Sequence, residues 1–247
     1  MKIHLGLIQE FIAGMMPDRE AIIAKDRVVT YGELAARSRR FARVLASRGL
    51  GCRTERAALK PWESGHDHVA IYLYNCPEYL EIMYGSYKAR AASVNINYRY
   101  KADELHYLLA NSGARAIVYH AAFASTLAEV RGRLPLLQHL FQIPDDSGAP
   151  LLPGAVDYET ASASEPATLL DLPFSPDDLY VLYTGGTTGI PKGVLWRQED
   201  VFFNGLGGNL PGFERLDSED KLRAHVSMGI GGRARVCLPF MHGAGQW

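Results

Sequence analysis

The sequence predicts an α/β protein in which helices flank a β-sheet. Between residues 69 and 119, segments with strand-type and helix-type patterns alternate, as they do when crossover helices connect the strands of one sheet. The first of these segments, 69–74, is an almost unbroken apolar run rich in β-branched and aromatic side chains, which is typical of a strand covered on both faces. The length of 247 residues provides enough chain for a buried core. In such folds, ligands usually bind beyond the carboxyl ends of the strands.

The first clear element is a helix over residues 31–48, with a short strand at 28–29 before it. Thr30 and Glu33 have the spacing of a capping box, in which each side chain satisfies a backbone donor of the first turn. Gly49 supplies a left-handed residue that ends the helix. One face of the helix carries side chains at helical spacing, namely Leu34, Ser38, Phe41 and Leu45.

The alternating region contains its own start and stop signals. Pro77 fits the first turn of a helix, and Gly113 fits the end of the next one. The expected elements are a strand at 69–74, a helix at 77–91, a strand at 93–96, a helix at 103–111 and a strand at 116–119. A further apolar strand is expected at Leu179–Tyr183.

Four further segments fall outside the alternating pattern of strands and helices. Segment 52–67, with its proline, glycine and many charges, is expected to be a surface excursion. Residues 144–176 hold six of the 13 prolines and are expected to form a long surface connection. Seven glycines without a period between 205 and 233 predict a mobile loop and no repeat array. The apolar run 236–240 is expected to form a strand.

Composition excludes several classes of function. A net charge of -1 gives no electrostatic basis for binding nucleic acid or a membrane surface. Polar residues interrupt the apolar N-terminus, so it lacks the core of a signal peptide, and no segment approaches membrane-spanning length. Cys52, Cys76 and Cys237 are too few and too far apart for a disulfide framework or a zinc spacing. The expected compartment is the cytoplasm.

The most informative motif is the segment 183–194, YTGGTTGIPKGV, which follows an apolar strand. Its glycines allow backbone N–H groups to approach a polyphosphate closely. Its threonine hydroxyls can donate to phosphate or join a magnesium shell. Lys192 brings a mobile positive charge, and Pro191 stiffens the exit from the loop. The motif therefore predicts phosphate binding.

Two better-known phosphate motifs do not fit. The Walker loop fails because Lys192 lies between Pro191 and Gly193, where that pattern needs glycine before the lysine and serine or threonine after it. The dinucleotide pattern fails because Gly185 and Gly186 are adjacent. A plain glycine-rich turn between two strands is the simplest alternative, and the threonines together with the Pro-Lys-Gly exit argue against it.

The motif resembles the phosphate-loop signature of the adenylate-forming superfamily, which contains acyl-CoA synthetases, luciferases and peptide-synthetase adenylation domains. Other segments resemble family landmarks in the same order, namely TYGEL at 30–34, VAIYLYNCPEYLE at 69–81, VNINYRY at 94–100 followed by ADELHYLL, and LPFMHGAG at 238–245. Together with VLWRQED, these segments look most similar to actinobacterial acyl-CoA synthetases that act on fatty or steroid-derived acids.

The resemblance implies a role for each residue of the motif. The residues that would wrap the ATP phosphates are Thr184, Gly185, Gly186, Thr187, Thr188 and Gly189. Lys192 would be the catalytic residue that neutralises the β- and γ-phosphates as pyrophosphate leaves, and Thr184 would lie near Mg²⁺. Gly185 stands where serine is frequent in the family, which removes a hydroxyl donor worth about 0.5–1.5 kcal/mol net. His242 matches a histidine beside the acyl pocket, whereas without the family a packed histidine would be the simpler interpretation.

The implied reaction has two halves. A carboxylate attacks the α-phosphate of ATP to give an acyl-adenylate and pyrophosphate, and coenzyme A then displaces AMP to form a thioester. The expected co-substrates and cofactors are ATP, Mg²⁺, coenzyme A and a small carboxylic acid, with no nucleic acid and no integral membrane segment. Residues 1–247 are expected to form part of the N-terminal AMP-binding (adenylation) domain, incomplete at its C-terminal end, with the small C-terminal domain absent.

Two other functions stay open at this stage. Because the family's later motifs have no counterpart before Trp247, the chain by itself is expected to be an inactive fragment. One alternative to a ligase is a non-catalytic nucleotide-binding module, which would bind ATP without pyrophosphate exchange. The other alternative is a truncated remnant without activity. The sequence does not identify the acid, the acyl acceptor or the oligomeric state.

Overall fold

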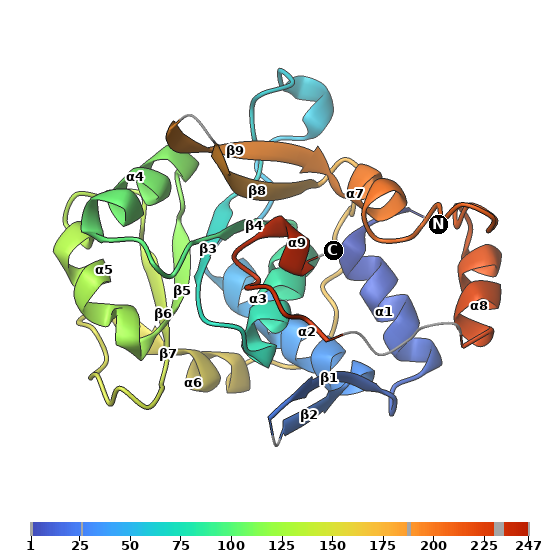
Figure 1. Ribbon diagram of the computed structural model, residues 1–247, viewed down its shortest axis with the longest axis horizontal. Coiled ribbons are helices and arrows are strands. Elements are labelled where there is room, and N and C mark those ends of the chain that lie inside the picture. The colour runs from blue at the N-terminus through green and yellow to red at the C-terminus, as the bar shows by residue number, and fades with distance from the viewer. Residues whose placement is uncertain (1, 26, 187–188, 230–234, 247) are drawn as a thin grey trace.

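A seven-stranded mixed sheet forms the centre of the computed structural model, which describes residues 2–25, 27–186, 189–229 and 235–246 (Figure 1). Its strands are β3 (His68–Tyr72), β4 (Ala92–Asn95), β5 (Ala116–His120), β6 (His139–Ile143), β7 (Ala155–Asp157), β8 (Leu179–Gly186) and β9 (Gly189–Arg197). Their spatial order is β7-β6-β5-β3-β4-β8-β9, and every neighbouring pair is parallel except β8 and β9. A separate two-stranded hairpin consists of β1 (Glu20–Ala24) and β2 (Arg27–Thr30). The expected α/β fold class is confirmed.

Helices cover both faces of this sheet. The helices of the described residues are α1 (Leu5–Met15), α2 (Tyr31–Ser47), α3 (Pro77–Lys88), α4 (Ala102–Ser112), α5 (Ala124–Arg131), α6 (Tyr158–Ala163), α7 (Gln198–Asn204), α8 (Glu219–Ser227) and α9 (Gly243–Gln246). In Figure 1, α4 and α5 lie on one side of the strands, and α2, α3 and α6 lie on the other. No helix in the described part of the chain is long and apolar enough to cross a membrane.

Alternating side chains of the central strands produce two apolar cores. Ile71 of β3 belongs to the core that contains Phe41 of α2 and residues of α1, α3 and α6. Its neighbour Tyr72 belongs to the opposite core, together with Leu108 of α4 and Leu127 of α5. Strand β3 is buried along its whole length, as its unbroken apolar sequence predicted.

Helix α2 begins and ends as the sequence predicted. The Thr30 hydroxyl accepts a hydrogen bond from the backbone N–H of Glu33 (3.1 Å), and the Glu33 carboxylate accepts one from the Thr30 N–H (2.8 Å), which completes the capping box. Gly49, with φ of 69°, follows the helix in the left-handed region. Gly113 ends α4 in the same way, with φ of 61°.

Three expectations about irregular segments are wrong. The segment 144–176 contains β7 and α6, and the Asp157 carboxylate caps α6 by accepting a hydrogen bond from the Thr160 N–H (2.8 Å). The glycine-rich segment 205–233 contains α8, so its described part is not simply a loop. Residues 236–240 form no strand, and their apolar side chains include two that are about half exposed, Val236 and Leu238.

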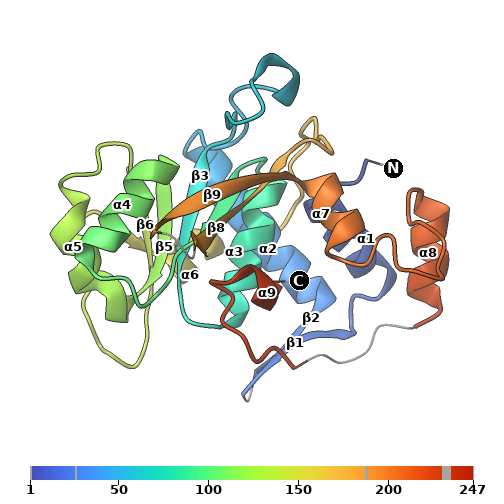
Figure 2. The same ribbon diagram turned by 45° about the horizontal axis from the view of Figure 1, so that its top comes forward.

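The structure also contains elements that the sequence did not reveal, among them α1, β1, β6, α5 and α7. Helix α1 is stabilised by tertiary contacts, because the Leu5 N–H donates to the side chain of Gln198 (2.9 Å), the first residue of α7. Segment 52–67 leaves the layers as expected and projects beyond the sheet (Figure 2). We call this segment the excursion. A single antiparallel bridge between Cys52 and His66 closes its base.

Candidate functional site

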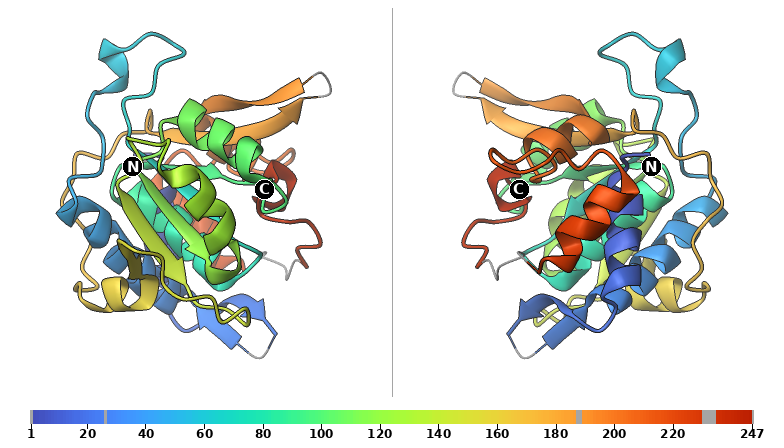
Figure 3. Two further views of the ribbon diagram at one scale, coloured as in Figure 1. Left: turned by 90° about the vertical axis from the view of Figure 1, so that its left-hand side faces the viewer. Right: turned by 90° about the vertical axis from the view of Figure 1, so that its right-hand side faces the viewer.

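The predicted phosphate motif lies on a β-hairpin at one edge of the sheet (Figure 3). Strands β8 and β9 pair from Leu179 opposite Arg197 to Gly186 opposite Gly189. At the base of the hairpin, the Gln198 N–H donates to the Asp178 carbonyl (2.9 Å). The described residues of the motif thus belong to two extended strands, and the wrapping of the ATP phosphates by this motif stays a prediction. Strand pairing satisfies backbone groups that an open loop would leave free.

The hairpin brings two of the predicted site residues together. Thr184 and Lys192 face each other in the register of β8 and β9, and both side chains are exposed. Gly189 has φ of 142°, a conformation that side chains disfavour, as expected for a glycine at a tight reversal. Gly185 and Gly186 lie in β8. Thr187 and Thr188 fall outside the described residues.

Gly193, at the end of the motif, has a packing role. A Cβ atom at this position would lie 2.8 Å from the Tyr183 ring, so only glycine leaves that ring in place. The Tyr183 hydroxyl donates to the Asn111 side chain of α4 (2.7 Å). The Tyr107 hydroxyl of the same helix donates to the Pro191 carbonyl (3.1 Å). Helix α4 thus holds the hairpin from one side.

Two asparagines that sequence reasoning missed connect the carboxyl ends of the strands to the last described segment. The Asn95 amide accepts from the Tyr183 N–H (2.8 Å) and donates to the Tyr183 carbonyl (3.1 Å) and to the Met241 carbonyl. The Asn75 amide donates to the Leu238 carbonyl (3.1 Å) and accepts from the Phe240 N–H (2.7 Å). The only sequence signal is a polar residue at the end of each apolar strand. Beyond these strand ends, the structure therefore gathers residues from three distant segments.

His242 lies in this last segment. Its N–H donates to the Pro239 carbonyl (3.0 Å), and its carbonyl accepts from the Gly245 N–H (2.9 Å). Its imidazole is exposed, so it does not pack as a core histidine. Its neighbour Met241 shares the Asn95 amide with Tyr183, which places the histidine segment beside the strand that carries Thr184.

A cleft of about 500 Å³ lies among the excursion, the C-terminal end of α4 and the hairpin. Residues that line it include Arg53, Trp62, Asn111, Arg115, Tyr183 and Gly193. Asp67 engages both guanidinium groups, with Arg53 Nε at 2.6 Å and Arg115 Nε at 3.2 Å from Oδ1. His68 beside them is buried, and burial lowers the pKa of its imidazole. The cleft therefore presents a polar wall whose charges are already largely paired.

A buried ionic cluster fixes the base of the hairpin. The Asp178 carboxylate accepts from Arg90 through two bonds (2.9 and 2.7 Å) and lies 3.2 Å from His66 Nε2. Burial alone would raise the pKa of Asp178, but its contacts with His4, His66 and Arg90 hold that pKa well below the usual range. Burial would likewise lower the pKa of His66, but its contacts with Asp178 and Cys52 outweigh burial and raise it to about 9. For His4, burial prevails and lowers the pKa.

Comparison with known proteins agrees with this architecture. The model of the AMP-binding enzyme family matches residues 10–247. The medium-chain acyl-CoA ligase Mig of Mycobacterium avium is 50% identical over 241 residues, which are 97% of this chain and 44% of that protein. The 3-oxocholest-4-en-26-oate--CoA ligase of Rhodococcus rhodochrous is 33% identical over 250 residues, which are 100% of this chain and 42% of that protein.

Among solved structures, a long-chain-fatty-acid-CoA ligase (FadD1) from Archaeoglobus fulgidus superposes with a TM-score of 0.73 at 21% identity. That match covers 100% of this chain and 44% of the other, and it shows a shared fold. The chain thus spans less than half the length of these relatives. The resemblance seen in the sequence motifs is confirmed, and the chain belongs to the AMP-binding enzyme family.

Proposed function

We propose that the protein containing this chain activates a carboxylic acid with ATP, forming an acyl-adenylate and then a coenzyme A thioester. Family membership and the names of the relatives support this proposal, since both relatives described above are CoA ligases. The proposed acid is a medium-chain fatty acid or an acid derived from a steroid side chain, the two classes named by those relatives. We further propose that residues 1–247 form the N-terminal part of the adenylation domain and that the protein acts in the cytoplasm.

The observation that carries the proposal is the pairing of Thr184 with Lys192 near the tip of the hairpin. Both side chains are exposed, so an ammonium and a hydroxyl are available to a ligand at the same place. Phosphoryl chemistry of this kind depends mainly on positioning and on neutralising charge. Lys192 would balance the leaving pyrophosphate, while Thr184 would offer an oxygen ligand to the Mg²⁺ that accompanies ATP. His242 is proposed to border the acid, because Asn95 holds its segment beside β8.

The proposal can be tested by ATP–pyrophosphate exchange with octanoate as the acid. The chain would be joined to the part of the M. avium ligase that lies beyond the aligned region, and the joined protein would be compared with the 247-residue chain. We expect exchange from the joined protein and none from the chain alone, because the active relatives are more than twice as long. ATP binding without acid-dependent exchange in the joined protein would instead favour a non-catalytic nucleotide-binding module.

The same assay isolates the contribution of Lys192. Replacement by alanine in the joined protein is expected to slow exchange by about 10²-fold or more, as when a preorganised charge-stabilising group is removed. Lys192→Arg keeps the charge and is expected to retain part of the activity. Lys25→Ala, which removes another exposed lysine in the turn of the β1–β2 hairpin, serves as the matched control. Equal rates for Lys192→Ala and Lys25→Ala would remove Lys192 from the mechanism.

A further inference from the structure

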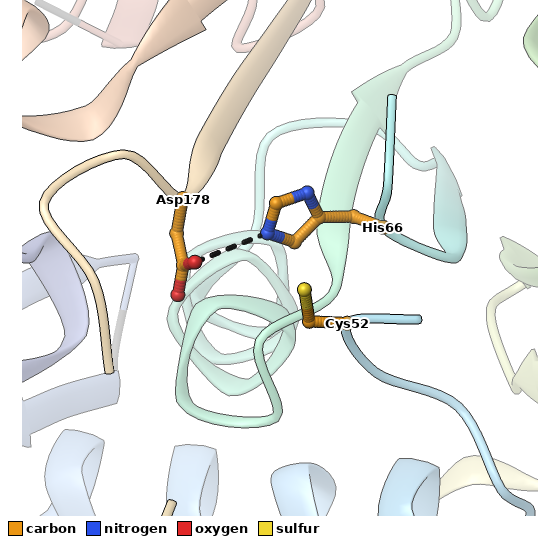
Figure 4. Close-up of side chains that lie close together, drawn as sticks. All are labelled: Cys52, His66 and Asp178. Carbon is orange, nitrogen blue, oxygen red and sulfur yellow. Dashed lines mark hydrogen bonds and ion pairs between the residues drawn. The ribbon is translucent and has the colours of Figure 1, made fainter. Parts of the chain in front are cut away.

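Three side chains with different metal-binding atoms converge at the base of the hairpin (Figure 4). Cys52 and His66 come from the two ends of the excursion, where the antiparallel bridge places them next to each other. Asp178 is the residue immediately before β8. The Cys52 sulfur, one His66 nitrogen and one Asp178 oxygen all lie within 4.8 Å of one another. Thiolate, imidazole and carboxylate together form a donor set typical of Zn²⁺.

His4 provides a second and independent observation at the same place. Its side chain is completely buried, and neither ring nitrogen has a hydrogen-bond partner among the described residues. Its Nε2 nevertheless lies 3.3 Å from Asp178 Oδ2, on the carboxylate of the cluster. Buried polar atoms almost always have a partner, so an orphaned one indicates a group that is missing from its surroundings, such as water or an ion. The His4 imidazole thus contacts the Asp178 carboxylate through Nε2, whereas its buried Nδ1 has no partner among the described residues.

Arg90 does not prevent a cation from binding there. Glu55 receives two hydrogen bonds from this guanidinium (2.7 and 2.8 Å) and thereby balances its charge. The carboxylate of Asp178 and a thiolate of Cys52 would then balance the two charges of a zinc ion. Carboxylates that bind metals are commonly held by outer hydrogen bonds, and the two bonds from Arg90 to Asp178 have that form.

We propose that Cys52, His66 and Asp178 bind one Zn²⁺ ion, with His4 outside the ligand set and in contact with the Asp178 carboxylate. The ion would tie the excursion to the base of the hairpin, and the contact of His4 with Asp178 would connect the N-terminal segment to the same place. The fourth position of a tetrahedral ion would then be taken by water. The proposal is independent of the ligase reaction and can be tested on the chain without ATP or an acid.

The test is a titration of the 247-residue chain, prepared without a histidine tag and freed of metal, with Zn²⁺ and separately with Co²⁺. We expect one equivalent of Zn²⁺ to bind and to raise the melting temperature. Co²⁺ should give a thiolate charge-transfer band together with the strong visible bands of a four-coordinate ion. Cys52→Ala should weaken binding by more than about 100-fold and abolish the charge-transfer band. Cys237→Ala, at an exposed cysteine away from the cluster, should behave as the unchanged chain.

A second variant guards against loss of folding. In His66→Gln, the amide can still donate to Asp178, so the fold is expected to persist, as circular dichroism would show, while zinc binding is lost. Absence of saturable binding of one equivalent to the unchanged chain would overturn the proposal. An unchanged cobalt spectrum in a folded Cys52→Ala or His66→Gln variant would also overturn it, and the cluster would then be an ionic network without a metal.

Discussion

Gly193 shows how a residue of the predicted phosphate motif can be required for packing. In Gly193→Ala, the new Cβ would collide with the Tyr183 ring, which the hydrogen bond to Asn111 holds in place. We expect the free energy of unfolding to fall by about 1–3 kcal/mol, as for other overpacked sites. Urea unfolding measures this change. Gly132→Ala is the control, because that site has an ordinary helical backbone and open space around it. Equal stabilities of the two variants would contradict the packing role.

Lys88 is a buried lysine whose effect on stability should depend on pH. Its Nζ donates to Gln9 (2.6 Å) and Ser38 (2.7 Å) and pairs with Glu10. Burial outweighs the attraction of Glu10 and lowers the pKa of Lys88 from 10.5 to about 8. Between these two values the unfolded chain binds more protons than the folded one, so the contribution of Lys88 to stability rises with pH in that window and is constant below it.

Comparison with Lys88→Met isolates this effect, since the other titrating groups are common to both proteins. The stability of the unchanged chain relative to the variant is expected to rise between pH 8 and 10.5 by up to about 3 kcal/mol, the linkage equivalent of this shift. Denaturant unfolding at a series of pH values provides the measurement. A difference that stays flat across this window would show that Lys88 titrates normally.

At the scale of elements, two glycines in helices should respond to alanine with opposite signs. Gly85 lies where α3 crosses α2, and a Cβ there would lie 2.9 Å from both the Phe41 ring and the Ser38 carbonyl. Gly14 lies in α1 with nothing within 4 Å of the added atom. Gly14→Ala should stabilise the chain by about 0.5–1 kcal/mol through helix propensity, whereas Gly85→Ala should destabilise it. Thermal unfolding compares the two, and the same sign for both would refute the close approach of α2 and α3.

Elements whose signals are local were predictable from the sequence. The capping box of α2 involves Thr30 and Glu33, three residues apart, and the apolar run of β3 needs no knowledge of its neighbours. Helix α1 was not predictable in the same way, because the side chain that satisfies its first N–H, Gln198, is 193 residues away. Strand β7 is only three residues long and gives no periodic signal.

In the candidate site, too, the local features were predictable from the sequence and the contacts between distant residues were not. The chemistry of the phosphate motif was evident from residue types, but its placement on paired strands depends on the register of β8 and β9. Asn95 contacts Tyr183, which is 88 positions away in the sequence, and Met241, which is 146 positions away. No short sequence pattern contains such pairs. His66 and Asp178 are 112 positions apart, which is far outside any recognised spacing of metal ligands.

At the scale of the whole molecule, the hairpin is joined to the rest of the fold through the apolar side chains of β8 and through polar contacts at its two ends. Strands β4 and β8 face each other at Val94 and Val181, whereas β8 pairs with β9 almost to the tip. The Asp178 cluster holds the base, and Asn95 holds the backbone of Tyr183 near the other end. The views in Figure 3 show the hairpin extending away from the helices. The residues proposed to meet ATP thus lie toward the tip of a hairpin whose strand β8 is buried in both apolar cores and which has polar attachments at its two ends.

The strand order also affects how the chain would emerge during synthesis. Strand β4 lies between β3 and β8, yet β5, β6 and β7 all precede β8 in the sequence. Until residues 179–186 leave the ribosome, one edge of the fully buried β4 has no neighbour, although the strands on its other side can already assemble. An open edge with apolar side chains is a template for unwanted pairing. A nascent chain paused in the proline-rich segment 144–176 would therefore be a substrate for chaperones that shield strand edges.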